Sequence, residues 1–157
     1  MSLLSFSKLE LSALGELCSG EFTFGSLSTK IGIKKESGSR VFALLEQKGM
    51  IEVERKGTSK ILRLSRALQA QAFRQIFFQR NGKIEWLAGK SLGVLAVLAS
   101  SDGVSRESLD SECGCSKPIL SKSLTRLKAA GIVSEDQIVS ITDVFVKNFV
   151  YYYSVNL

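Results

Sequence analysis

Two short stretches decide how this sequence folds: residues 27–33, LSTKIGI, and residues 39–51, SRVFALLEQKGMI. In the first, apolar residues four positions apart predict a helix that ends at Gly32. In the second, apolar residues at helical spacing are followed by Gly49, whose missing side chain permits a left-handed cap. The two stretches therefore predict two consecutive helices joined by a tight turn.

The neighbouring residues complete a small domain around this helix pair. Residues 9–17 repeat apolar side chains at 3.6-residue spacing, which predicts a preceding helix, and Thr23 is placed to cap the next one. Residues 50–55 alternate in polarity, which predicts a strand. Residues 56–59 favour a turn, and residues 60–64 predict the second strand of a hairpin. We therefore expect three helices followed by a β-hairpin.

The same pattern occurs a second time in the chain. A shift of 82 residues, without a gap, gives the identical pairs Ser26/Ser108, Leu27/Leu109, Gly32/Gly114, Lys35/Lys117, Ser39/Ser121, Leu45/Leu127 and Gly49/Gly131. Two copies of one small fold explain this repeat. At one position the copies differ: Gly38 aligns with Leu120, so we expect the first copy to lose a core contact and about 1 kcal/mol of helix propensity.

One further apolar helix is expected after each copy. Ser65 is placed to cap a helix that ends near Arg80, and Thr142 or Asp143 to open the last helix. Both helices are too apolar for exposed positions, so we expect them to pack the copies together or against a second subunit. The predicted class is α+β, mainly α with small β-hairpins, as two tandem domains: residues 1–65, a connecting helix at 66–82, and residues 83–157.

Composition excludes several classes of protein. The 157 residues are 45% apolar and 23% charged, which suits one mid-sized or two small globular domains. No apolar run reaches the roughly 18 residues of a membrane span, and no signal-peptide layout opens the chain, so we expect a cytoplasmic protein. Without histidine, imidazole bases and ligands are absent, and no nucleophile and base pair suggests an enzyme.

The net charge of +6 is concentrated in the first half of the chain. Residues 1–82 hold 13 Lys and Arg against 7 Glu, whereas residues 83–157 hold 8 basic against 8 acidic residues. A basic half joined to a neutral half indicates a polyanionic partner for the first half and another role for the second.

Residues 27–33 with 39–51, and again residues 121–133, resemble the helix-turn-helix and wing entry of winged-helix transcription regulators of the MarR and ArsR type. Together the two units are similar to tandem winged-helix regulators of archaea. The resemblance implies a third helix in the major groove and a hairpin on the DNA backbone. The DNA-contacting residues it implies are Lys34, Lys35, Ser37, Ser39 and Arg40 on the helix, and Arg55, Lys56, Thr58, Ser59 and Lys60 on the wing. In the second copy Lys117, Ser121, Lys122 and Arg126 would make weaker contacts, because an acidic wing with Glu135 and Asp136 would repel phosphate.

The chemistry of these residues agrees with this implication. Arg40 can offer guanine two parallel donors, and the short hydroxyls of Ser37 and Ser39 let the backbone come close. We therefore expect a sequence-specific DNA-binding transcriptional regulator that acts on double-stranded DNA without a cofactor. A homodimer through the connecting or C-terminal helix would meet half-sites about 34 Å apart.

Two alternatives to DNA binding stay open. Tandem winged helices also serve as protein-interaction scaffolds within larger assemblies, and the chain could be the regulatory segment of an enzyme. Binding to duplex DNA at low salt separates the DNA-binding protein from the scaffold.

The cysteines raise a separate question. Cys113 and Cys115 align with Ile31 and Ile33, which favours small buried apolar residues over a metal site. A soft-metal or redox sensor with Cys18 as third ligand is the alternative.

Overall fold

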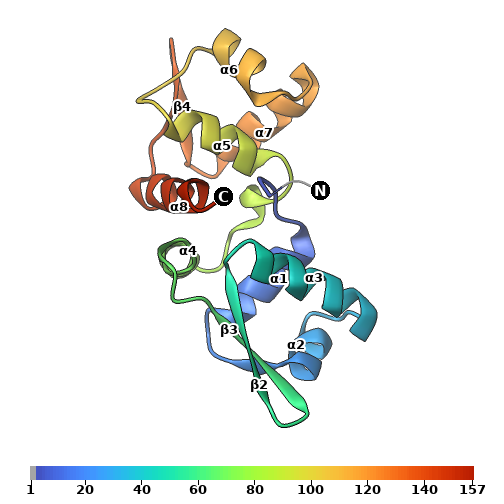
Figure 1. Cartoon of the computed structure of the whole chain (residues 1–157). Helices are drawn as coiled ribbons and strands as arrows, with labels where there is room; N and C mark the ends of the chain where they lie inside the picture. Colours follow the sequence, from blue (N-terminus) through green and yellow to red (C-terminus); the bar gives the residue numbers. More distant parts are fainter. Residues whose placement is uncertain (1–2) are drawn as a thin grey trace.

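The computed structural model describes residues 3–157, and the chain is mainly helical with two small antiparallel sheets (Figure 1). The N-terminal half (residues 3–82) contains α1 (Lys8–Leu17), β1 (Phe22–Thr23), α2 (Phe24–Lys30), α3 (Lys35–Gln47), β2 (Ile51–Lys56), β3 (Ser59–Leu64) and α4 (Leu68–Gln79). The C-terminal half (residues 83–157) contains the 3-10 helix η1 (Glu85–Leu87), α5 (Ser91–Ala99), α6 (Arg106–Cys113), α7 (Lys117–Ala129), β4 (Val133–Glu135), β5 (Val139–Ile141) and α8 (Val144–Val155). The predicted α+β class is confirmed. None of the helices within residues 3–157 has the length and hydropathy needed to span a bilayer.

Side-chain caps fix where four of the helices begin, including α6, where Ser105 Oγ accepts from the N–H of Ser108 at 3.2 Å. Ser7 Oγ accepts from the N–H of Glu10, and Glu10 Oε1 accepts from the N–H of Ser7, which forms a capping box at α1. Thr23 caps α2 as predicted, accepting from the N–H of Ser26 at 3.1 Å. Asp143 opens α8 by accepting from the first-turn N–H groups. These caps satisfy N–H groups that have no partner within the helix.

The predicted cap of the connecting helix is wrong. Helix α4 begins at Leu68 after Ala67, and no side chain caps it. Ser65 Oγ instead accepts from the N–H of Ala67 at 3.1 Å. A serine that bonds to the backbone two residues on stabilises a turn, and the helix therefore starts later than predicted.

The wing of the N-terminal half is a three-stranded sheet rather than a lone hairpin. Strands β2 and β3 pair over six positions, from Ile51↔Leu64 to Lys56↔Ser59, and the short strand β1 pairs with β3 on the other side. Only Gly57 and Thr58 lie between the strands, and Gly57 has a φ of +62°, which glycine adopts without strain. In the C-terminal half β4 and β5 pair over three positions, so this wing is shorter, as predicted.

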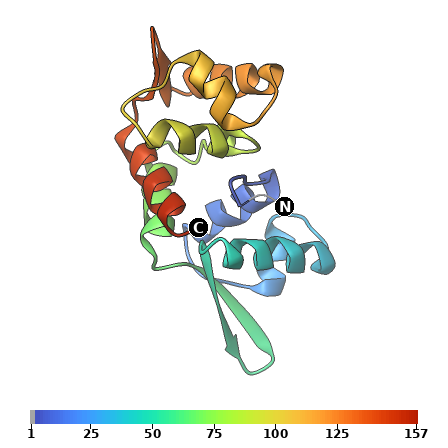
Figure 2. The same ribbon diagram turned by 45° about the horizontal axis from the view of Figure 1, so that its top comes forward.

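Helices α4 and α8 pack against each other between the two halves (Figures 1 and 2). They run antiparallel, because Gln69 of α4 bonds to Asn156 after α8 while Arg80 after α4 bonds to Asp143 before α8. Phe73 and Phe149, both buried, meet in the middle with ring centroids 6.0 Å apart. One apolar face of each extra helix is therefore buried within the chain, whereas Leu68 and Phe78 of α4 and Val144, Tyr151 and Val155 of α8 stay exposed.

Candidate nucleic-acid interface

Helix α3 buries one face and exposes the other. The turn that leads into it contains Gly32, whose φ of +74° favours glycine. The buried face consists of Gly38, Val41, Phe42 and Leu45. At the N-terminal end the structure exposes all five predicted helix residues: Lys34, Lys35, Ser37, Ser39 and Arg40. The amphipathic pattern of α3 thus leaves its polar N-terminal end free for a partner.

The tip of the wing is cationic and exposed. The predicted wing residues Arg55, Lys56, Thr58, Ser59 and Lys60 are all exposed. Nearer the core, Arg63 forms ion pairs with Glu21 and Glu54. The hydrogen bond from Arg63 lowers the pKa of the Glu54 carboxyl. Glu54 therefore pairs with Arg63, and no ion pair among the described residues engages Arg55, Lys56 or Lys60.

A hollow between α2, α3 and the wing brings the two predicted sets together. It is lined by Thr23, Phe24, Gly25, Ser28, Thr29, Ile33, Lys35, Ser39, Thr58, Ser59 and Lys60. The lining offers two ammonium groups and several hydroxyls but no carboxylate. Lys60 Nζ lies 5.9 Å from the centroid of the Phe24 ring, which ties the wing to α2. Such a lining suits the phosphate and sugar groups of nucleic acid.

The floor of this hollow depends on Gly38. A Cβ atom built there would lie 2.7 Å from Ser28 Oγ and 3.5 Å from the Phe24 ring. The glycine therefore lets α2 and α3 approach closely, and Phe24 packs edge-on against Phe42 over the vacated space, with centroids 5.1 Å apart. The core contact expected to be lost at Gly38 is replaced, because Ser28 Oγ lies close to where a Cβ atom would be and the rings of Phe24 and Phe42 pack beside it.

The cations of α3 and the wing are not neutralised by ion pairs within the part of the chain that the structure describes. None of the ion pairs found within residues 3–157 involves Lys34, Lys35, Arg40, Arg55, Lys56 or Lys60. Unpaired cations on one side of a domain create a positive potential that attracts polyanions. The positive charge of the N-terminal half is therefore available at this surface.

The weaker set predicted on α7 is divided. Lys117, Ser121 and Lys122 are exposed. Arg126 is exposed as well, but its Nη2 donates to the carbonyl of Ala88 at 3.3 Å and to Ser91 Oγ at 3.4 Å. The guanidinium of Arg126 is thus engaged within the chain, and only the N-terminal part of α7 presents unpaired cations.

The second wing does not present the repelling charge expected of Glu135. Arg106 Nε and Nη2 donate to its two carboxylate oxygens at 3.0 and 2.8 Å, and Lys128 forms a further ion pair with it. The bonds from Arg106 and then Lys128 lower the pKa of Glu135 to about 2. Two cations compensate one carboxylate, so the repulsion is reduced to that of Asp136, which is exposed.

The cysteines do not form a common site. Burial raises the pKa of Cys18 to about 12, and burial followed by the neighbouring Cys115 raises the pKa of Cys113 to about 11. Thiols that stay protonated at neutral pH are poor nucleophiles. Within residues 3–157 no three side chains of the kinds Cys, Asp and Glu gather where they could hold a metal ion. The geometry favours a packing role for the cysteines, with Cys18 buried and Cys113 and Cys115 half-buried.

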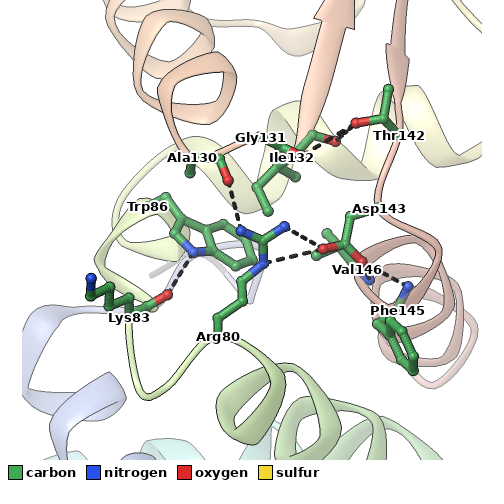
Figure 3. Close-up of polar contacts among 10 residues, drawn as sticks. All are labelled: Arg80, Lys83, Trp86, Ala130, Gly131, Ile132, Thr142, Asp143, Phe145 and Val146. Carbon is green, nitrogen blue, oxygen red and sulfur yellow. Dashed lines mark hydrogen bonds and ion pairs between the residues drawn. The ribbon is translucent and has the colours of Figure 1, made fainter.

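Sequence reasoning missed two polar residues that hold the interface in place. Lys48, just after α3, forms a buried ion pair with Glu10 of α1 at 2.6 Å. Arg80 joins α4 to the C-terminal half (Figure 3): Nη1 donates to the carbonyl of Ala130 at 2.7 Å, and Nε to Asp143 Oδ2 at 3.1 Å. The Ser-x-x-Glu pattern that begins at Ser7 could have revealed Glu10 as a capping residue, whereas no local pattern marks Arg80.

The N-terminal half has the architecture of a winged helix-turn-helix domain: three helices, with a hairpin wing that follows the second helix of the turn. No family model matches the chain, and no curated protein matches it. Among solved structures, reduced HlyU from Vibrio cholerae is 19% identical over 46% of this chain and 76% of its own, with a TM-score of 0.43. A likeness this distant carries no argument, so the class rests on the geometry of α1 to β3.

Proposed function

We propose that this chain is a sequence-specific DNA-binding transcriptional regulator. The N-terminal end of α3 would enter the major groove, and the tip of the wing would contact the backbone beside it. Arg40 is the candidate for reading guanine, and Ser37 and Ser39 for contacts to base edges or phosphates. Lys35 and Lys60, which face the hollow, would bind phosphate.

One observation carries the proposal: of the exposed cations in the N-terminal half that form no ion pair among the described residues, four, Lys8, Lys30, Arg66 and Arg74, lie elsewhere, and six belong to α3, its N-cap and the wing. Their partner must be anionic, and the lining of the hollow also supplies hydroxyl donors without a carboxylate. A small anion would need one or two of these cations, whereas six cations spread over a helix and a wing match a repeating polyanion.

Several finer features belong to the same proposal. The C-terminal half would be a second winged helix of tandem, archaeal type, with no catalytic activity in either half. A regulator of this kind acts where the DNA is, so the cytoplasm is its proposed location. The homodimer expected from the sequence remains a prediction that the mass of the free protein tests.

The test is a titration of labelled random-sequence duplex over a salt series, followed by selection of preferred sites from that pool. We expect the logarithm of the affinity to fall with the logarithm of salt with a slope of about −5, for six neutralised phosphates. Lys35→Ala/Arg40→Ala should weaken binding about 100-fold and lower the slope by about 2. Lys83→Ala/Lys147→Ala removes two charges outside α3 and the wing and serves as the matched control.

Two results would contradict the proposal. The absence of duplex binding at low salt would favour the protein-interaction scaffold instead. Equal losses in the test and control variants would mean that net charge alone attracts DNA, without a defined surface on α3.

A further inference from the structure

We infer that a single chain contacts two adjacent half-sites on one duplex, with α3 in one and α7 in the other, so that no second copy is needed. The inference rests on the proposed function. It concerns the orientation of the two halves relative to each other, which is set by their packing within the chain.

The first step is the correspondence between the halves. Helices α3 and α7 each contain 13 residues, and both bounds of α7 lie 82 positions after those of α3. Helices α4 and α8 each contain 12 residues and follow the two wings. Each half therefore offers one candidate recognition helix and one helix for packing.

The second step is the symmetry of the central contact. Phe73 is the sixth residue of α4 and Phe149 the sixth residue of α8, and these two rings meet at the crossing of the antiparallel helices. Two equivalent helices that cross at equivalent residues are related by an approximate two-fold axis. This is the arrangement of a symmetric dimer interface, in which one surface packs on its own equivalent. Here the interface joins two halves of one chain.

The third step is the direction of the recognition helices. Figures 1 and 2 show the N-terminal ends of α3 and α7 on the same side of the molecule, with the wings directed away from each other. Helices α4 and α8 lie toward the opposite side. The approximate two-fold axis relates α3 to α7. Because the N-terminal ends of both helices lie on the same side, one straight duplex could contact both of them.

The fourth step is that several contacts fix the angle between the halves. Arg80 bonds to Ala130 after α7 and to Asp143 before α8, with its guanidinium 5.7 Å from the centroid of the buried Trp86 ring (Figure 3). On the other side, Phe6 accepts from the N–H of Gly89 at 2.9 Å, and its ring packs against Phe149. The spacing of α3 and α7 is therefore set before DNA arrives.

The two half-sites would be unequal. On α7 the exposed cations without a partner among the described residues are Lys117 and Lys122, because Arg126 bonds to Ala88 and Ser91 and Lys128 pairs with Glu135. Most of the affinity would come from the N-terminal half. The C-terminal half would add contacts on the next turn of the duplex and so favour an asymmetric two-part site.

The test uses the full chain and a duplex selected by the wild-type protein. Native mass spectrometry should find one chain per duplex, and hydroxyl-radical footprinting should find two protected segments about 10 base pairs apart. Lys117→Ala/Lys122→Ala should lower the affinity about 10-fold and remove one protected segment. Lys147→Ala, a charge removed from α8, should change the affinity less than two-fold.

A second arm changes the DNA instead of the protein. Five base pairs inserted between the half-sites turn one of them to the opposite face of the duplex. The wild-type affinity should then fall to that of the α7 variant, and the α7 variant itself should lose nothing further.

Three outcomes overturn the inference. Two chains per duplex would show that a homodimer provides the second half-site. If Lys117→Ala/Lys122→Ala leaves the footprint unchanged while Lys35→Ala/Arg40→Ala still weakens binding, the C-terminal half does not contact the DNA, and the proposed function stands. A wild-type protein that binds no duplex would overturn both.

Discussion

Replacing Lys48 by Met should destabilise the fold far more than removing any exposed lysine. Lys48 Nζ lies 2.6 Å from Glu10 Oε2, and the two side chains are 2% and 5% exposed. The same ammonium donates to the carbonyl of Ser5 at 2.6 Å and lies 4.9 Å from the centroid of the Phe6 ring. Glu10 Oε1 accepts from the N–H of Ser7. The pair thus ties the end of α3 to α1 and to the N-terminal segment.

The magnitude follows from the distance and the burial. At 2.6 Å and an effective dielectric constant of about 20, the attraction is about 6 kcal/mol before desolvation is subtracted. Desolvation offsets much of this gain, so loss of both charges costs little. Loss of one charge leaves the other buried without a partner, which costs about 3–5 kcal/mol. Lys48→Met should lower the free energy of unfolding by that amount.

Urea denaturation followed by circular dichroism at pH 7 measures this effect in a double-mutant cycle. Glu10→Gln/Lys48→Met should recover to within about 1.5 kcal/mol of the wild type, since glutamine also serves in a capping box. Lys147→Met is the matched control, because Lys147 and Asp102 form an exposed pair at 3.9 Å and such pairs contribute little. The reasoning is refuted if Lys48→Met costs less than about 1 kcal/mol, or if the double variant is no more stable than Lys48→Met.

Two further predictions concern a carboxylate and a hydroxyl. The pKa of Glu135, about 2 against an ordinary value of 4.5, means that its pairing with Arg106 and Lys128 stabilises the fold above pH 4.5 and less as the pH falls toward 2. Glu135→Gln should therefore lose less Tm between pH 4.5 and 2.5 than the wild type, and an equal loss would exclude this contribution. Ser28 Oγ is buried without a hydrogen-bond partner within residues 3–157. Ser28→Ala should thus be neutral or stabilising by about 1 kcal/mol in urea denaturation. Adding Gly38→Ala should gain about 1 kcal/mol more from helix propensity, and a net loss in the double variant would contradict the packing described at Gly38.

The elements that sequence analysis predicted well are those with a local cause. Helix α3 follows from the spacing of Val41, Phe42 and Leu45, which places three apolar side chains on one face. The same spacing directs Lys35 and Arg40 outward, so the exposure of the predicted helix residues was predictable. Alternation of polarity over residues 50–64 likewise identified the wing.

The features that escaped prediction depend on contacts distant in sequence. Lys48 and Lys35 are the same residue type on or next to the same helix, yet Lys48 is buried because Glu10, 38 residues earlier, lies opposite it. Arg80 bonds to a carboxylate 63 residues further on. Strand β1 has only two residues and forms because β3 offers an unpaired edge. None of these contacts has a local signal in the residues around it.

The two halves differ electrostatically in the share of their cations that is paired within the chain, as well as in how many cations they contain. The C-terminal half has 8 Lys and Arg, and four of them, Arg106, Lys128, Arg126 and Lys147, bond to or form ion pairs with groups of that half. Arg80 of the N-terminal half is similarly engaged with Asp143 across the boundary. A cation that is already paired within the chain binds a phosphate group less strongly than an unpaired one. The neutral half is thus suited to secure the geometry of the chain, and the basic half to supply its attraction for a polyanion.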